Sequence, residues 1–198
     1  MEGSTPILLH VCCAPCATTP IDRLRKDYAI VGFFFNPNIY PESECLFRQH
    51  EALDYFRRLG LDHIPCDQPF EDWHREILPW CDSPEGSTRC RHCFEYRLNR
   101  TAAVAAFHGI SLFTTTLTVG PNKPASVIFP VGFEAASRHG VTFLAEDFKK
   151  KDGYRTSVEK SRIEGMYRQN YCGCEFSYLE RQHRERVKRQ DYDPNNIE

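Results

Sequence analysis

Cysteines are the residues of this sequence best suited to chemistry, and the chain has 10 of them. Seven fall into three tight groups, Cys12-Cys13-x-x-Cys16, Cys90-x-x-Cys93 and Cys172-Gly173-Cys174. The N-terminal sequence MEGSTPILLHVCC lacks the basic region and the long apolar region of a secretory signal, so we expect a cytoplasmic protein. In that reducing compartment, clustered cysteines indicate metal ligation or thiol redox chemistry rather than a disulfide framework.

Two of the three groups have the spacing of metal ligands. Cys90 and Cys93 stand at the entrance of an expected helix, whose N-terminus favours thiolates. Cys12 and Cys13 close an expected strand, and where the chain turns both sulfurs can reach one site. Four thiolates suit a zinc ion or a [4Fe–4S] cluster, and the spacing leaves both open. Cys16 either donates to a second metal ion or packs in the helix that follows.

The third group has a one-residue spacer, which is tight for two ligands of one metal ion. Cys172 and Cys174 can form a redox-active pair or place thiols beside a cofactor, because Gly173 supplies backbone freedom between them. The alternative is a surface turn with two idle thiols. The remaining cysteines are isolated and are expected to be buried apolar residues: Cys45, Cys66 and Cys81.

The elements that must position these groups alternate between short apolar strands and helices. We expect strands at 6–13, 28–35, 61–65, 110–117 and 141–144, and helices at 17–27, 42–59, 93–108, 127–138 and 156–168. Thr18 or Thr19 is the expected cap of the first helix, and 69–89 is expected to be mostly loop. This alternation predicts an α/β class, single-domain, parallel-sheet, Rossmann-like fold over 1–177, followed by a charged, frayed helical tail at 178–198.

Parallel strands place their carboxyl ends at one edge of the sheet, where ligands bind in open α/β folds. Five segments with side chains suited to binding or catalysis lie at the ends of the predicted strands: Cys12-Cys13, Asn36-Pro37-Asn38, Cys66-Asp67, Thr114 to Thr118 and Glu146-Asp147. We therefore expect the metal site at this edge.

Composition excludes two classes of protein. The 198 residues carry a net charge of −2, so a strongly basic coat for nucleic acid is absent, although a local basic patch is allowed. No apolar run approaches the roughly 20 residues that a membrane span needs, and we expect no membrane partner.

The cysteine groups and their neighbours resemble one known family. The successive segments LLHVCCAPC, FFFNPNIYPESECLFR, RCRHCFEYRL, FTTTLTVGPNK, FLAEDFKKKDGY and YRQNYCGC are similar to the motifs of QueH-type epoxyqueuosine reductases. The resemblance implies conversion of epoxyqueuosine to queuosine at the wobble position of tRNA, on a fold similar to the nucleotide α-hydrolase-like group. It implies a [4Fe–4S] cluster on Cys12, Cys13, Cys90 and Cys93, and a redox-active pair at Cys172 and Cys174. It further implies a single iron near the cluster, for which Cys16 is the candidate ligand.

The implied reaction removes an epoxide oxygen, which takes two electrons and two protons and releases water. Standard side chains supply no electrons, so a redox cofactor or a dithiol is required. A low-potential electron donor of unknown identity is also expected. Asp67 and Asp147 are the candidate acids at the sheet edge, and Asp67 is assigned to the catalytic set. Candidates for stacking a base are Tyr40, Phe94, Tyr96 and Tyr171; candidates for meeting RNA phosphates are Arg48, Arg89, Arg91, Lys123 and Lys149 to Lys151.

Two other functions remain open at this point. The same thiols can build a non-catalytic zinc-binding RNA module. A nucleotide-using tRNA thiolation enzyme of the PP-loop type is disfavoured, because CCAPCATT stands where that class needs a phosphate loop rich in glycine and serine.

Overall fold

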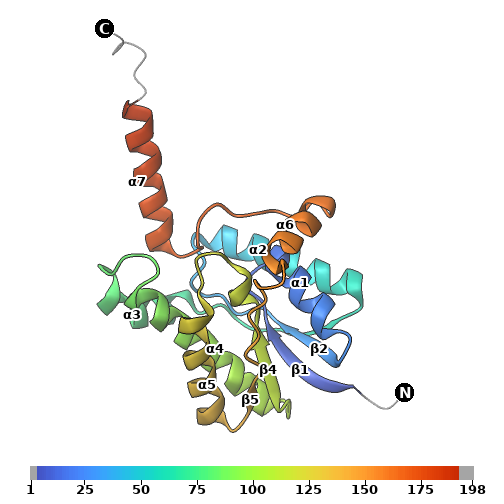
Figure 1. The fold of residues 1–198 in the computed structure, drawn as a ribbon. Coiled ribbons are helices and arrows are strands. Elements are labelled where there is room, and N and C mark those ends of the chain that lie inside the picture. The colour runs from blue at the N-terminus through green and yellow to red at the C-terminus, as the bar shows by residue number, and fades with distance from the viewer. Residues whose placement is uncertain (1–3, 192–198) are drawn as a thin grey trace.

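The computed structural model describes residues 4–191, with side chains through residue 188, and its centre is a five-stranded, all-parallel sheet (Figure 1). The sheet order is β3-β2-β1-β4-β5. The strands are β1 (Thr5–His10), β2 (Tyr28–Phe33), β3 (Asp62–Ile64), β4 (Leu112–Thr115) and β5 (Thr142–Phe143). The α-helices are α1 (Ala14–Leu24), α2 (Glu42–Leu59), α3 (Phe70–Ile77), α4 (Thr88–Phe107), α5 (Ala125–His139), α6 (Gly153–Ile163) and α7 (Glu175–Asp191). The predicted α/β fold with five parallel strands is confirmed.

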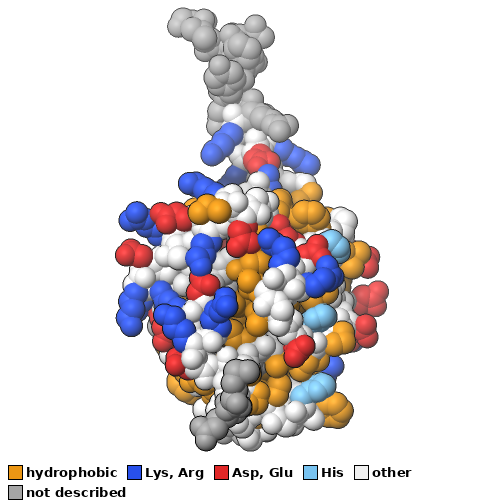
Figure 2. Space-filling view, turned by 90° about the vertical axis from the view of Figure 1, so that its right-hand side faces the viewer, with side chains coloured by type: hydrophobic (Ala, Val, Ile, Leu, Met, Phe, Trp, Pro, Cys, Tyr) orange, Lys and Arg blue, Asp and Glu red, His pale blue; other side chains and the backbone are white. Residues whose placement is uncertain are grey.

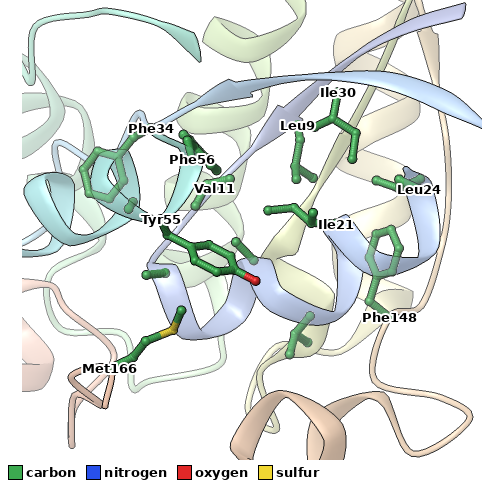
Figure 3. Close-up of a cluster of buried hydrophobic side chains, with 14 of the residues drawn as sticks. Leu9, Val11, Ile21, Leu24, Ile30, Phe34, Tyr55, Phe56, Phe148 and Met166 are labelled. Atoms are coloured by element: carbon green, nitrogen blue, oxygen red, sulfur yellow. The ribbon is translucent and has the colours of Figure 1, made fainter. Parts of the chain in front are cut away.

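Helices cover both faces of the sheet, which is why its central strand is apolar at consecutive positions. In β1, Ile7 and Leu9 face a core shared with α1 and α2, whereas Leu8 faces α4 and α5. Figure 3 shows the first of these cores, where Ile21 of α1 and Phe56 of α2 meet the underside of the sheet.

The prediction that 69–89 is mostly loop is wrong for its first half. Helix α3 runs from Phe70 to Ile77, and a 3₁₀ turn, η1 (Leu78–Trp80), follows it. Trp73 and Ile77 stand four residues apart on one face and are buried together with Cys93 and Cys174. This contact stabilises a helix of eight residues that is too short to be recognised from its periodicity.

The first helix begins earlier than predicted. Helix α1 starts at Ala14, with Cys13 as its N-cap residue, so neither Thr18 nor Thr19 is the cap. Both threonines lie inside the helix, where their hydroxyls donate to carbonyl oxygens of Pro15 and Gly153, each at 2.9 Å. Cys13 and Cys16 consequently belong to the first turn of α1, directly beyond the carboxyl end of β1.

The last helix departs from the rest of the fold. Helix α7 begins at Glu175, three residues before the expected tail, and projects away from the body of the molecule (Figure 1). The end of the predicted tail, 192–198, lies outside the described residues. Among the helices described, none has the length and apolar character needed to cross a membrane.

Candidate metal and redox site

A cavity of about 320 Å³ opens at the carboxyl edge of the sheet, beside the start of α1 and the start of α4. Its walls include four thiols, contributed by Cys13, Cys16, Cys90 and Cys172. Its other walls come from the loop after β4, from α6 and from the segment before α7. The lining side chains also include Phe94 of α4 and Arg184 of α7, together with Lys123, Arg168, Gln169 and Tyr171. The sheet edge predicted to carry the metal site thus carries a cavity lined by thiols.

The first thiol group consists of Cys12, Cys13 and Cys16. Their sulfurs all lie within 4.8 Å of one another, and the Sγ atoms of Cys12 and Cys13 are 4.0 Å apart. Two thiolates bound tetrahedrally to one metal ion, with metal–sulfur bonds of about 2.3 Å, would be about 3.8 Å apart. The spacing of this group therefore suits metal ligation without rearrangement of the backbone.

Hydrogen bonds place negative charge on this group. The Thr116 hydroxyl donates to Sγ of Cys12 at 3.2 Å and accepts from the Cys12 backbone N–H at 3.0 Å. Hydrogen bonds from Cys13 and Cys16 lower the pKa of Cys12 well below its usual value, whereas the shared hydrogen bond raises the pKa of Cys13 to about 11. Gln169 Nε2 approaches Sγ of Cys13 at 3.6 Å. Of the three thiols, Cys12 is therefore the one whose ionisation the surroundings favour.

A buried histidine supports the loop that carries Thr116. Nε2 of His10 donates to the carbonyl oxygen of Phe35 at 3.1 Å, so Nδ1 must accept from the Thr115 hydroxyl, 2.8 Å away. Burial lowers the pKa of His10 to about 3, so its ring is neutral. The same Thr115 oxygen accepts from the backbone N–H of Leu117 at 3.1 Å, which holds the start of the 3₁₀ turn η2 (Thr116–Val119).

The second thiol group consists of Cys90 and Cys93 on α4, and Cys172 and Cys174 before and at the start of α7. The backbone N–H of Gly86 donates to Sγ of Cys90 at 3.1 Å. Burial raises the pKa of Cys90 to about 11 and that of Cys93 to about 12. All 10 cysteines are free thiols in the structure, including the pair expected to cycle as a disulfide.

Lys123 lines the cavity and is close enough to thiols of both groups to interact with them electrostatically. Burial opposes its charge, but the thiols of Cys172, Cys12 and Cys16 outweigh that effect and raise its pKa. Lys123 therefore stays protonated and places a positive charge beside the cysteine thiols.

Several predicted residues do not reach the cavity. Asp67 is exposed and lines a separate depression with Tyr96 and Arg100, and Asp147 accepts from the backbone N–H of Lys149 at 3.3 Å, as a turn residue does. The structure therefore does not bring Asp67 to the thiols.

The residues predicted to bind RNA divide in a similar way. Phe94 and Tyr171 line the cavity, whereas Tyr40 packs against Phe70 and Tyr178. The phosphate-contact prediction is wrong for Arg48 and Arg89. Both are buried, and they form ion pairs with Glu44 at 2.7 Å and with Glu180 at 2.9 Å.

Thr116 and Gln169 contact the thiols without having been predicted to do so from the sequence. Thr116 lies in a segment that was placed at the correct edge, but only the pairing of β4 with β1 brings it to Cys12. Gln169 belongs to the YRQNYCGC segment, and its position in that motif was the available signal.

The sequence of this chain is similar to those of one protein family. The family profile described as "Epoxyqueuosine reductase QueH" matches residues 7–180. The chain belongs to this family. Curated QueH relatives include proteins from Thermotoga maritima, 37% identical over 88% of this chain and 91% of the relative, and Streptococcus pyogenes serotype M1, 35% identical over 86% and 69%. A solved structure entitled as a predicted tRNA methyltransferase subunit from Methanocaldococcus jannaschii aligns with a TM-score of 0.49 and 13% identity, over 77% of this chain and 76% of that one.

The QueH match contains every residue of both thiol groups. It ends at residue 180, which lies one and a half turns into α7. The outer part of that helix therefore belongs to this chain but not to the matched region.

Proposed function

We propose that the protein reduces epoxyqueuosine to queuosine at the wobble position of tRNA, the last step of queuosine biosynthesis. The observation that carries this proposal is the QueH match over 7–180, within which four of the seven grouped cysteines line one cavity. The cavity volume lies at the lower end of the range of small-ligand sites, so one extruded nucleotide base is a suitable occupant.

The residues present fit an iron–sulfur group. We assign a [4Fe–4S] cluster to Cys12, Cys13, Cys90 and Cys93, and an additional mononuclear iron to a site that includes Cys16. Thiolates are the ligands that such groups require, and the sulfurs of Cys12, Cys13 and Cys16 lie within 4.8 Å of one another, which supports metal binding at this end of the site. Lys123 compensates part of the negative charge that bound thiolates would bring.

When bound, the iron–sulfur group would supply electrons one at a time. The thiols of the chain itself can supply two electrons in one step. Closing a disulfide between Cys172 and Cys174 releases two electrons and two protons, which is what conversion of an epoxide to an alkene and water consumes. Cys172 lines the cavity and Cys174 is buried behind it. An external low-potential donor must then reduce the disulfide before the next turnover.

Other side chains would position the substrate. Phe94 and Tyr171 are the aromatic side chains of the proposed base-binding set that reach the cavity, and they can stack on the extruded base. Asp67 is not retained as the proton donor, since its carboxylate lies outside the cavity. In the proposed reaction, the thiols of Cys172 and Cys174 supply the protons instead of Asp67.

Anaerobic purification followed by iron, sulfide and zinc analysis tests the cofactor assignment. The test reaction is reduction of epoxyqueuosine in an anticodon stem-loop with dithionite, followed by nucleoside mass spectrometry. We expect iron and sulfide in the protein and queuosine in the RNA. Iron-loaded protein that leaves epoxyqueuosine unchanged in both stem-loop and full-length tRNA would contradict the proposal.

The alternative is a non-catalytic zinc-binding RNA module, favoured by the tight spacing of Cys12, Cys13 and Cys16. Protein purified with one zinc ion, without sulfide or visible absorbance, and inactive after reconstitution with iron and sulfide, would support it.

A further inference from the structure

Helix α7 has two parts with different surroundings. Its first residues are anchored to the body, because Phe176 packs against Trp73 and lies 4.7 Å beneath the guanidinium carbon of Arg89. Glu180 also accepts from Arg89 at 2.9 Å. From His183 to Lys188 every side chain is exposed, so this part extends into solvent beyond the body (Figure 1).

The outer part is strongly basic in a chain that is acidic as a whole. Residues 181–188 contain four basic side chains and one acidic one, a net charge of +3 with His183 neutral, whereas the whole chain carries −2. The space-filling view shows basic side chains on both sides of this projecting segment (Figure 2). Arg181 pairs with Glu185 at 2.8 Å, but Arg184 and Lys188 form no ion pair with any side chain within 4–188.

Three of these cations share one face of the helix, and that face begins at the cavity. At 100° per residue, Arg181, Arg184 and Lys188 fall within about 60° of one another and of Ser177. Ser177 and Arg184 both line the cavity. We call Arg181, Arg184 and Lys188 the basic stripe; it continues from the cavity outward, and Lys188 lies about 16 Å along the helix from Ser177.

The outer part of α7 lacks contacts with the body and gains little stability from packing, so its positive charge points to a partner outside the chain. A row of three cations, of which Arg184 and Lys188 have no ion pair within 4–188, starts at a cavity large enough for a nucleotide base and matches a polyanion that enters the same cavity. We propose that the basic stripe of α7 binds the sugar–phosphate backbone of the RNA stem next to the nucleotide in the cavity. This inference rests on the proposed function.

The test measures binding of the holoprotein to a fluorescent, epoxyqueuosine-bearing anticodon stem-loop at 50 to 200 mM salt, without oxygen. Loss of two phosphate contacts lowers the slope of log affinity against log salt by roughly 1.4 to 1.8. We therefore expect wild-type affinity to fall about tenfold further than that of Arg184→Gln/Lys188→Gln across this range. The charge-conserving Arg184→Lys/Lys188→Arg variant should restore the wild-type slope, which separates loss of charge from loss of the helix.

Two controls carry matched charge changes. Arg186→Gln removes a cation from the opposite face of the same helix, and Arg25→Gln/Lys26→Gln removes two exposed cations after α1, at the other end of the sheet. We expect at most a minor slope change in both. An effect of Arg186→Gln equal to that of Lys188→Gln alone would overturn the proposal, since it would show that the face does not matter.

The remaining outcomes separate this inference from the proposed function. If the wild type reduces epoxyqueuosine in the RNA but the double variant has the same salt dependence of binding, the proposal for the basic stripe is overturned and the proposed function stands. If the salt dependence of binding changes in the double variant but the wild type does not reduce epoxyqueuosine, the basic stripe is supported as an RNA-binding surface and the proposed function is contradicted. The proposal that the basic stripe binds RNA is overturned if the protein does not bind RNA. It is also overturned if the stripe binds phosphatidylglycerol vesicles in place of RNA.

Discussion

The two thiol groups meet at one cavity but are built in different ways. The first group, Cys12, Cys13 and Cys16, is contained in one turn of chain after β1, and polar groups surround its sulfurs. The second group joins α4 to the segment before α7, and its buried members pack with Trp73 and Ile77. Polar contacts favour a thiolate at Cys12, whereas burial raises the pKa values of Cys90 and Cys93, so these two thiols would ionise only when a metal group binds them.

The largest effect should follow from removing a sulfur of the first group. Cys12→Ala or Cys13→Ala should lose most of the bound iron and all activity. Changes to groups that merely support a ligand cost about 10–100-fold, so loss of a ligand should cost more. Iron and sulfide analysis of the anaerobic proteins measures this. Cys45→Ala, which removes a buried thiol 3.7 Å from the carbonyl oxygen of Asn36, is the matched control and should keep its iron.

Cys172→Ser and Cys174→Ser should separate the roles within the second group. Each should leave the iron–sulfur absorbance nearly intact and abolish multiple turnovers, because one thiol cannot close a disulfide. Iron, sulfide and turnover are measured on the same samples. Loss of one iron per chain with unchanged sulfide would instead make the pair a ligand of the additional iron. Undiminished turnover with dithionite would remove the pair from the mechanism.

Thr116→Val should weaken the first group without removing a sulfur. The variant leaves the backbone N–H of Cys12 without its acceptor, which costs about 1–3 kcal/mol of unfolding free energy for a buried donor. Urea unfolding of the metal-free protein measures the loss, and Thr116→Ser should recover most of it. If Thr116→Val matches wild type, the hydroxyl contributes nothing to holding Cys12.

The smallest effect concerns a thiol outside both groups. Burial raises the pKa of Cys66 to about 11, so at pH 8 about a thousandth of it is thiolate, and its alkylation should speed up roughly tenfold per pH unit from pH 8 to 10. Peptide mass spectrometry after timed iodoacetamide treatment gives the rate. A rate that levels off below pH 9 would show that Cys66 is not held as the structure describes.

Asp67 lies outside the thiol-lined cavity for a reason that is found in the strand order. Asp67 follows β3 and does lie at the carboxyl edge, as the parallel sheet requires. However, β3 is the edge strand, two strands away from β1, and neighbouring strands are about 4.8 Å apart. The sequence indicates that strands are parallel and buried, but strand order depends on how the helices pack on both faces.

Local patterns determined much of this protein. Short apolar runs between helices specified a parallel sheet, and the turn after the first run placed Cys12 and Cys13 together, because neighbours in sequence must remain neighbours in space. Tertiary structure decided what separate segments do to each other. It set Thr116 against Cys12 across more than a hundred residues, and it brought Cys174 to Cys93 by packing both on Trp73. Such contacts form only when burial of apolar surface fixes the helices, and no local pattern contains that information.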